Sequence, residues 1–182
     1  GNDFLNGGKG NDKLIGGSGR DSAVFGSANN KIDLTKTARQ NTKEGRDILS
    51  SIENVEGGDG NDIIRGNTAD NYLYGENGKD SLYGGRGNDS LNGGEGNDLL
   101  NGGIGNDKLI GGKGRDTAVF SSKSNVIKLF TTKKQNTKDG KDILIGIENV
   151  NAGSGNDKVY GSKGSNILSG GKGNDVLIGG LG

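Results

Sequence analysis

The sequence predicts an all-β fold, a right-handed parallel β-roll (a β-helix solenoid) with two loop-bearing interruptions. The first observation is a period of nine residues: seven glycines recur at this spacing, and six of the blocks that they open carry an aspartate five residues later. These glycines are Gly57, Gly66, Gly75, Gly84, Gly93, Gly102 and Gly111. Nine residues fit neither a helix nor a plain strand, so each block joins a glycine turn to one short strand. Two blocks then make one coil, with its turns on opposite edges.

The second observation is the composition. The chain of 182 residues has 39 Gly and no Pro, Cys, His, Met or Trp, and only 27% of it is apolar. Such a chain buries too little apolar surface to offset the entropy of ordering it, so something outside the chain must stabilise the fold. Lys+Arg and Asp+Glu balance at 23 each, and no apolar run is long enough for a membrane span. We therefore expect neither a nucleic-acid partner nor a membrane span.

The blocks follow one another in a repeating order. A repeat block covers residues 1–24, a connector 25–56, a central repeat block 57–119, a second connector 120–151 and a truncated repeat block 152–182. Residues 1–87 align without a gap onto residues 96–182, so the connectors belong to a larger repeat. Their ends keep the nine-residue phase, which predicts one more rung on either side of each polar loop (35–46 and 131–141) that leaves the stack. The alternative is a separate module of two strands in each connector.

The eighth position of each block is a large aliphatic residue in a short extended segment, so successive copies point to one face. We expect them to form a thin core, made of Leu14, Ile64, Leu73, Leu82, Leu91, Leu100, Leu109, Val159, Leu168 and Leu177.

The chemistry lies in the turn, which reads Gly-Gly-x-Gly-x-Asp. Of the 17 aspartates, 11 stand at this sixth position, where a row of carboxylates would repel unless a cation lay between them. The glycines permit a tight turn with its carbonyls pointing inward. Two stacked turns then offer two carboxylates and four carbonyl oxygens, a set that suits calcium. Zinc would need Cys or His, and magnesium would demand tighter geometry.

The run GGRGNDSLN, GGEGNDLLN, GGIGNDKLI, which begins at Gly84, closely resembles the RTX family of calcium-binding nonapeptide repeats in secreted bacterial proteins. The resemblance covers nearly the whole chain. In that family the second and fourth carbonyls and the Asp of one turn bind calcium together with the first and third carbonyls and the Asp of the turn 18 residues later.

The resemblance implies the following ligands, together with Asp12. In the central block, Gly58, Gly60 and Asp62 face Gly75, Asn77 and Asp80, while Glu76, Gly78 and Asp80 face Gly93, Glu95 and Asp98. Next, Gly94, Gly96 and Asp98 face Gly111, Lys113 and Asp116, and on the opposite edge Gly85, Gly87 and Asp89 face Gly102, Ile104 and Asp107. In the flanking blocks Gly1 and Asp3 face Gly16, Ser18 and Asp21, and Gly153, Gly155 and Asp157 face Gly170, Lys172 and Asp175.

Some units depart from the pattern. Asn71 and Asn166 replace the aspartate in equivalent units, so we expect weaker or empty sites there. Whether Asp12 or Asp107 uses Asn30 or Asn125 across a connector is left open by the sequence.

We expect no enzyme activity in this segment, because a Ser or Cys nucleophile needs a base and the chain has neither His nor Cys. The resemblance implies a structural module that folds on extracellular Ca²⁺ after its parent protein leaves the cell through a type I secretion machinery. The chain starts and stops inside repeats, so we expect a fragment, monomeric by itself, of a secreted or cell-surface protein. The alternatives are an adhesive or ice-binding repeat surface and the non-catalytic C-terminal part of a secreted hydrolase or epimerase.

Overall fold

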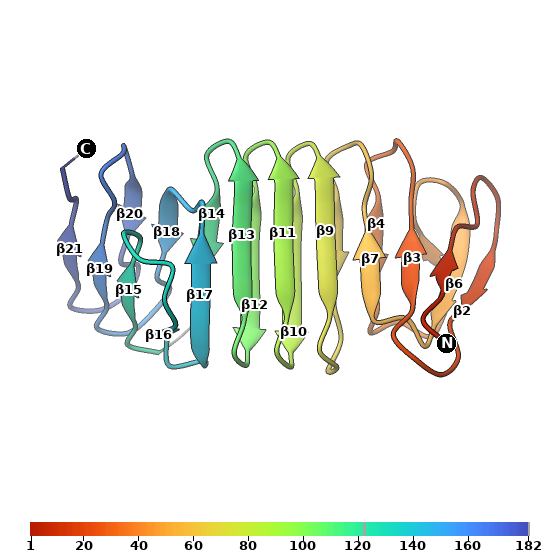
Figure 1. Cartoon of the computed structure of the whole chain (residues 1–182), viewed down its shortest axis with the longest axis horizontal. Helices are drawn as coiled ribbons and strands as arrows, with labels where there is room; N and C mark the ends of the chain where they lie inside the picture. The colour runs from red at the N-terminus through yellow and green to blue at the C-terminus, as the bar shows by residue number, and fades with distance from the viewer. Residues whose placement is uncertain (122, 182) are drawn as a thin grey trace.

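The computed structural model describes residues 1–121 and 123–181; Ser122, inside the second connector, and Gly182 lie outside the described residues. Within these residues there is no helix, and 21 short strands form two flat faces of an elongated stack (Figure 1). Neighbouring strands of a face are almost all parallel. The predicted all-β parallel roll is therefore confirmed.

Each face consists of one long sheet and one short sheet. The first long sheet has the order β1 (Phe4–Leu5), β3 (Ser22–Val24), β7 (Asn54–Glu56), β9 (Tyr72–Asn77), β11 (Ser90–Glu95), β13 (Lys108–Lys113), β17 (Lys141–Ile145), β16 (Gln135–Asn136). Beyond it lie β15 (Val126–Lys128), β19 (Lys158–Tyr160) and β21 (Val176–Ile178).

The second face is built in the same way. Its long sheet has the order β20 (Ile167–Ser169), β18 (Asn149–Asn151), β14 (Thr117–Val119), β12 (Leu99–Ile104), β10 (Ser81–Arg86), β8 (Ile63–Arg65), β4 (Lys31–Asp33). The short sheet is β2 (Lys13–Ile15), β6 (Arg46–Ser50) and β5 (Gln40–Asn41).

The core is a double row of aliphatic side chains between the two faces. In the central block Leu82 pairs with Leu100 and Leu91 with Leu109, so each strand repeats its partner's pattern 18 residues later. These four leucines are the second residues of their strands, point inward and are almost fully buried. Equivalent positions in the connectors join the same core, as Ile32, Val55, Ile127 and Val150 do.

Two predicted core residues are not buried. Leu168 is only partly buried, and Leu177 is 44% exposed. Leu168 lies in β20 and Leu177 in β21, and each of these strands pairs with one neighbour only among the described residues. Leu168 still packs against the core as a partly buried residue, so the expectation was wrong for Leu177 alone, which lies in the last of the described strands.

The connectors do not leave the stack as completely as the sequence suggested. In the first, β5 pairs antiparallel with β6, and β6 pairs parallel with β2 as a regular rung. The side-chain amide of Gln40 then replaces a peptide group: its oxygen accepts the Asp33 N–H at 2.7 Å, and its nitrogen donates to the Asp33 carbonyl at 3.2 Å. Gln135 bonds Lys128 in the same way at 2.6 and 3.3 Å. A hairpin is thus inserted into each face.

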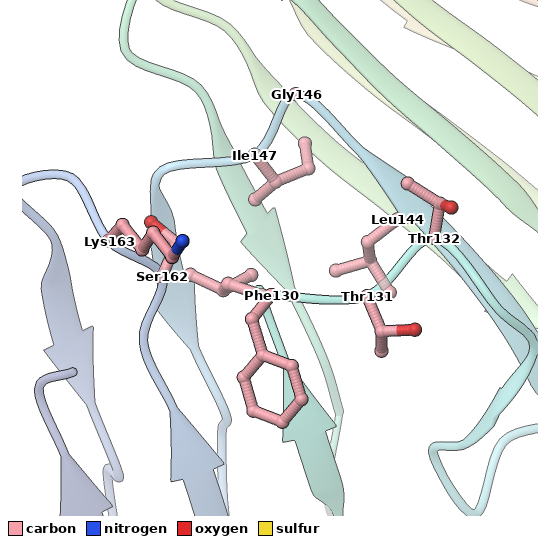
Figure 2. Close-up of a pocket in the computed structure, with 9 residues that line it drawn as sticks. Phe130, Thr131, Thr132, Leu144, Gly146, Ile147, Ser162 and Lys163 are labelled. Atoms are coloured by element: carbon pink, nitrogen blue, oxygen red, sulfur yellow. The ribbon is translucent and has the colours of Figure 1, made fainter. Parts of the chain in front are cut away.

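Beside the second hairpin lies a shallow pocket of about 290 Å³ (Figure 2). Leu129, Phe130, Leu144 and Ile147 supply most of its apolar lining, and Lys163 stands at its rim. Phe130 is 61% exposed.

Candidate metal centres

Acidic and amide side chains form ladders along the two edges of the roll, at the points where strands begin. One edge carries Asp3, Asp21, Glu53, Asn71, Asp89, Asp107 and Asp142, followed by Asn125, Asp157 and Asp175. The other carries Asp12 and Asp47, followed by Asn30, Asp62, Asp80, Asp98, Asp116, Glu148 and Asn166. All eleven aspartates singled out from the sequence lie in these ladders.

Except at Asp3 and Asp12, which begin the ladders, one carboxylate oxygen of each ladder aspartate joins it to the previous turn. The N–H of Asp62 donates to Oδ1 of Asp80 at 2.7 Å, and the N–H of Asp80 donates to Oδ1 of Asp98 at 2.8 Å. The N–H of Asp89 bonds Oδ1 of Asp107 in the same way at 2.8 Å. These bonds fix the position of each bonded carboxylate along the stack and its orientation, because donor and acceptor belong to neighbouring rungs.

The second carboxylate oxygen has no partner. The Oδ2 atoms of nine ladder aspartates are buried and accept no hydrogen bond within the described residues: Asp12, Asp21, Asp62, Asp80, Asp89, Asp98, Asp107, Asp116 and Asp157. Each buried carboxylate oxygen without a partner lowers the stability of the fold by about 1–3 kcal/mol or more. Asp3 and Asp175, which stand at ladder ends, are exposed and half-buried respectively.

The same burial changes the acidity of these groups. Loss of hydration raises the pKa of six ladder carboxyls, and the backbone N–H bonds offset only part of the rise. The pKa rises from 3.8 to about 7 for Asp62 and Asp107 and to about 6 for Asp80, Asp89, Asp98 and Asp116. At neutral pH these carboxylates therefore need a neighbouring positive charge to be stable in the ionised form.

Glycine is required where the turns approach one another. A Cβ on Gly75, at the first position of its turn, would overlap Oδ2 of Asp80. Gly78, at the fourth position, has φ of 137°, and a Cβ there would overlap the carbonyl oxygen of Gly60 in the neighbouring turn. The backbone is therefore kept open around each carboxylate.

The oxygens assembled here fit calcium. Among the described residues no three acidic side chains are placed to hold a metal by themselves, so carboxylates would have to act together with backbone carbonyls. The third-position carbonyls of Asn77, Glu95 and Lys113 each accept one N–H, at 2.7 to 2.8 Å. A carbonyl has a second lone pair, which remains for a cation. An adaptable set of oxygens, two of them charged, is the environment that Ca²⁺ prefers.

The comparison with known families agrees with this chemistry. Four copies of the RTX calcium-binding nonapeptide repeat match residues 1–32, 56–91, 83–118 and 148–182, which together make up more than half of the chain. The chain belongs to the RTX family. RTX repeats bind Ca²⁺, so this is a calcium-binding structural module that takes several ions. A search of the curated proteins found no match.

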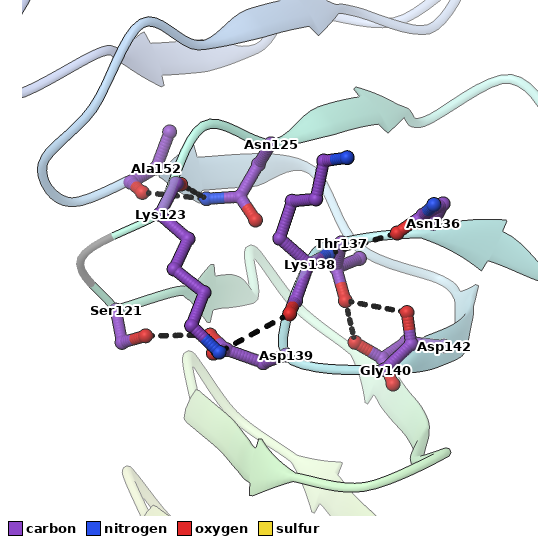
Figure 3. Close-up of polar contacts among 10 residues, drawn as sticks. All are labelled: Ser121, Lys123, Asn125, Asn136, Thr137, Lys138, Asp139, Gly140, Asp142 and Ala152. Atoms are coloured by element: carbon purple, nitrogen blue, oxygen red, sulfur yellow. Dashed lines mark hydrogen bonds and ion pairs between the residues drawn. The ribbon is translucent and has the colours of Figure 1, made fainter.

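In two RTX-like turns a side-chain amide bonds the backbone carbonyls of neighbouring turns. The Nδ2 of Asn30 donates to the carbonyls of Ala28, at 2.9 Å, and of Gly57, at 3.1 Å. These are a fourth-position and a first-position carbonyl, which the family pattern assigns to calcium. Asn125 repeats the arrangement toward Lys123 and Ala152 (Figure 3). The NH₂ group stands where the carbonyls of two turns converge, so these rungs can stack without metal.

The other two ladder asparagines are engaged differently. Oδ1 of Asn71 accepts the N–H of Asn67 at 2.8 Å, and its Nδ2 donates to the Glu53 carbonyl at 2.8 Å. Asn166 makes the equivalent bonds to Ser162 and Glu148. The side-chain oxygens of Asn71 and Asn166 therefore already accept a backbone N–H, whereas the aspartate of a regular turn leaves one oxygen free.

The RTX ladders also contain residues that sequence reasoning missed. Across the connectors, Asp12 and Asp107 use neither Asn30 nor Asn125: their N–H groups donate to Oδ1 of Asp47 and of Asp142, both at 2.8 Å. The signal was present in the segments GRDIL and GKDIL, which repeat the fourth to eighth positions of a nonapeptide. It was missed because these segments are out of phase with the glycine period.

Proposed function

We propose that this segment is a structural module of a larger exported bacterial protein that folds when it meets extracellular Ca²⁺. RTX repeats typify secreted bacterial proteins, which supports an extracellular or cell-surface location. The observation that carries the proposal is the row of buried carboxylate oxygens without partners. None of the three ion pairs found among the described residues involves a ladder carboxylate at the sixth position of a repeat. Calcium binding and folding are then one event, because the cation neutralises buried carboxylates that no Lys or Arg within the described residues pairs with.

The ligands that we propose are those of the family pattern, one ion between each pair of stacked turns. Two carboxylates such as Asp80 and Asp98 supply the charge, and the first- to fourth-position carbonyls complete the cage. Extracellular modules bind calcium at about 10⁻⁴–10⁻³ M. Such affinities keep the module unfolded in a calcium-poor cytosol, so that it can pass a type I secretion channel before it folds as a monomeric spacer outside.

Circular dichroism tests this proposal directly. In EDTA the chain is expected to give a disordered spectrum, and millimolar calcium is expected to convert it cooperatively to a β spectrum. Magnesium at the same concentration serves as the control and is expected to have little effect. A β spectrum that is the same in EDTA and in calcium would contradict the proposal.

Two alternative functions have less support. An ice-binding or adhesive face needs a regular outward ladder, yet the third positions vary among Lys9, Asp59, Arg86, Ile104 and others. The pocket beside the second hairpin has Lys163 as its one titratable lining residue, so its lining offers no acid–base pair. No helix within residues 1–121 and 123–181 has the length and apolarity to cross a bilayer. Any catalysis by the parent protein is proposed to reside outside this segment.

A further inference from the structure

The family match leaves residues 33–55 and 119–147 uncovered, and each of these segments contains one of the inserted hairpins. The turn of the second hairpin, Thr137–Asp142, shares the left-handed second position of a nonapeptide turn, although only one of its glycine positions is kept and that residue, Gly140, lacks the positive φ of regular fourth positions. Lys138, at the second position, has φ of 66°, in the left-handed region that glycine occupies in regular turns. Gly140, at the fourth position, lies against the Gly105 carbonyl so closely that a Cβ would overlap it.

This turn also stacks like a regular one. The N–H of Gly105 donates to the Asp139 carbonyl at 3.1 Å, as that of Gly96 donates to Lys113 at 2.8 Å in the central block. The N–H of Asp107 meets Oδ1 of Asp142 at 2.8 Å, the distance found between regular turns. The hairpin turn is therefore placed on the Gly102–Asp107 turn as a further nonapeptide turn would be.

The space between these two turns contains a carboxylate without a partner. Asp107 is 2% exposed, and its Oδ2 accepts no hydrogen bond in the described part of the chain. Asp142 is 3% exposed. The nearby Lys123 does not neutralise either group, because it pairs with Asp139 at 3.3 Å, whose other oxygen accepts the Ser121 hydroxyl (Figure 3).

We propose that each connector adds a calcium site of its own, one between Asp107 and Asp142 and one between Asp12 and Asp47. This inference rests on the proposed calcium-dependent folding and extends it to residues that the repeat pattern leaves out. By the family pattern, the carbonyls of Gly103 and Gly105 and those of Thr137 and Asp139 would complete the oxygen set of the second site. In the first site Oδ2 of Asp12 is likewise buried and without a partner within the described residues.

The same turn ends the ladder. Its first position is threonine in place of glycine, and the Thr137 hydroxyl donates to Oδ2 of Asp142, the oxygen that regular turns leave free. Thr42 bonds Asp47 in the same way. On the far side of the second hairpin turn the neighbouring turn is joined through side chains, since Ser121 and Lys123 bond the Asp139 carboxylate, and at the first the Gly26 N–H donates to the Glu44 carboxylate. A carboxylate that already accepts a hydroxyl binds a cation less strongly, so the connector sites fill after the regular ones.

The test counts calcium ions on the intact chain by native mass spectrometry, at calcium concentrations that saturate the regular sites. Asp142→Asn keeps the Oδ1 acceptor but removes the charge, and is expected to bind one ion fewer; the double variant with Asp47→Asn is expected to bind two fewer. Asp59→Asn is the control, because it removes the same charge from an exposed position and is expected to keep the wild-type count. An unchanged count in a folded Asp142→Asn chain would overturn the inference.

A second variant settles the matter if Asp142→Asn does not fold. Thr137→Gly restores the regular first position and frees Oδ2, so the last ion in a calcium titration is expected to bind at a severalfold lower concentration. A titration identical to that of the wild type would refute the connector site. A wild-type chain that binds no calcium at all would instead refute the proposed function, so the two failures are distinguishable.

Discussion

Replacing Asp98 by asparagine tests how the module depends on calcium. Asp98 is 2% exposed, its Oδ1 accepts the N–H of Asp80 at 2.8 Å, and its Oδ2 has no partner among the described residues. Asparagine keeps the Oδ1 acceptor and nearly the same volume. The change therefore removes a buried charge and one calcium ligand while the rung remains in place.

The two effects have opposite signs. Burial raises the pKa of Asp98 from 3.8 to about 6. Ionising this carboxyl in the metal-free fold at neutral pH therefore costs about 3 kcal/mol, at about 1.4 kcal/mol for each tenfold change in the equilibrium. With calcium, each site with a dissociation constant of about 10⁻⁴–10⁻³ M adds about 1–3 kcal/mol to the free energy of unfolding at about 10 mM calcium. Asp98 faces both Asp80 and Asp116, so its replacement weakens two sites and removes about 3–5 kcal/mol of calcium-dependent stabilisation.

The assay is urea unfolding over a range of calcium concentrations. The slope of the unfolding free energy against the logarithm of calcium concentration reports the number of ions released on unfolding. Asp98→Asn is expected to lower this slope by about two ions, while its tendency to form β-structure in EDTA is no lower than that of the wild type. Asp59→Asn, an exposed control, keeps the wild-type slope. If Asp98→Asn also kept it, the reasoning on the ladder would be refuted.

The remaining predictions concern pH, the core and the turns. Burial raises the pKa of Asp62 from 3.8 to about 7, so its protonated carboxyl stabilises the metal-free fold fully below pH 3.8, and this stabilisation is lost as the pH rises through 7. Circular dichroism in EDTA is therefore expected to show more β-structure at low than at high pH. A pH-independent spectrum contradicts this prediction. Leu91→Ala, at a fully buried site, should lower the unfolding free energy in calcium by about 2–5 kcal/mol, measured in urea, whereas Leu177→Ala, 44% exposed, should change it far less. Gly78→Ala should abolish calcium-induced folding because its Cβ overlaps a neighbouring carbonyl. Gly8→Ala adds only the strain of its φ of 68° and meets nothing within 4 Å, so it should still fold. Equal behaviour of the two variants would show that the turns are less closely stacked.

The regular part of the roll could be predicted from the sequence because each nonapeptide encodes its own local structure. A glycine turn, a sixth-position aspartate and an eighth-position aliphatic residue recur at one spacing, and a repeated unit that cannot bury its face alone must stack on its copies. The inward placement of Leu82 and Leu91 and the ladder position of Asp98 follow from this spacing alone.

The connectors could not be predicted in the same way. The order of their strands along the stack differs from the order in the sequence. The chain first forms β4, which pairs with the later strand β8, and then returns to place β6 beside the earlier strand β2. Gln40 and Gln135 make this possible by side-chain bonds to a backbone that is close in space only after folding. Asp47 and Asp142 join the ladders through that insertion, and a fixed period applied to the sequence misses them.

The sequence by itself determined the period, the inward and outward side of each residue and the chemistry of the ligands, since these depend on neighbours within one nonapeptide. Tertiary structure alone decided which turns the connectors place beside one another, and so where each ladder ends. The physical reason is that stacking depends on contacts between segments 18 to 35 residues apart, whose partners are selected by the closure of the whole coil.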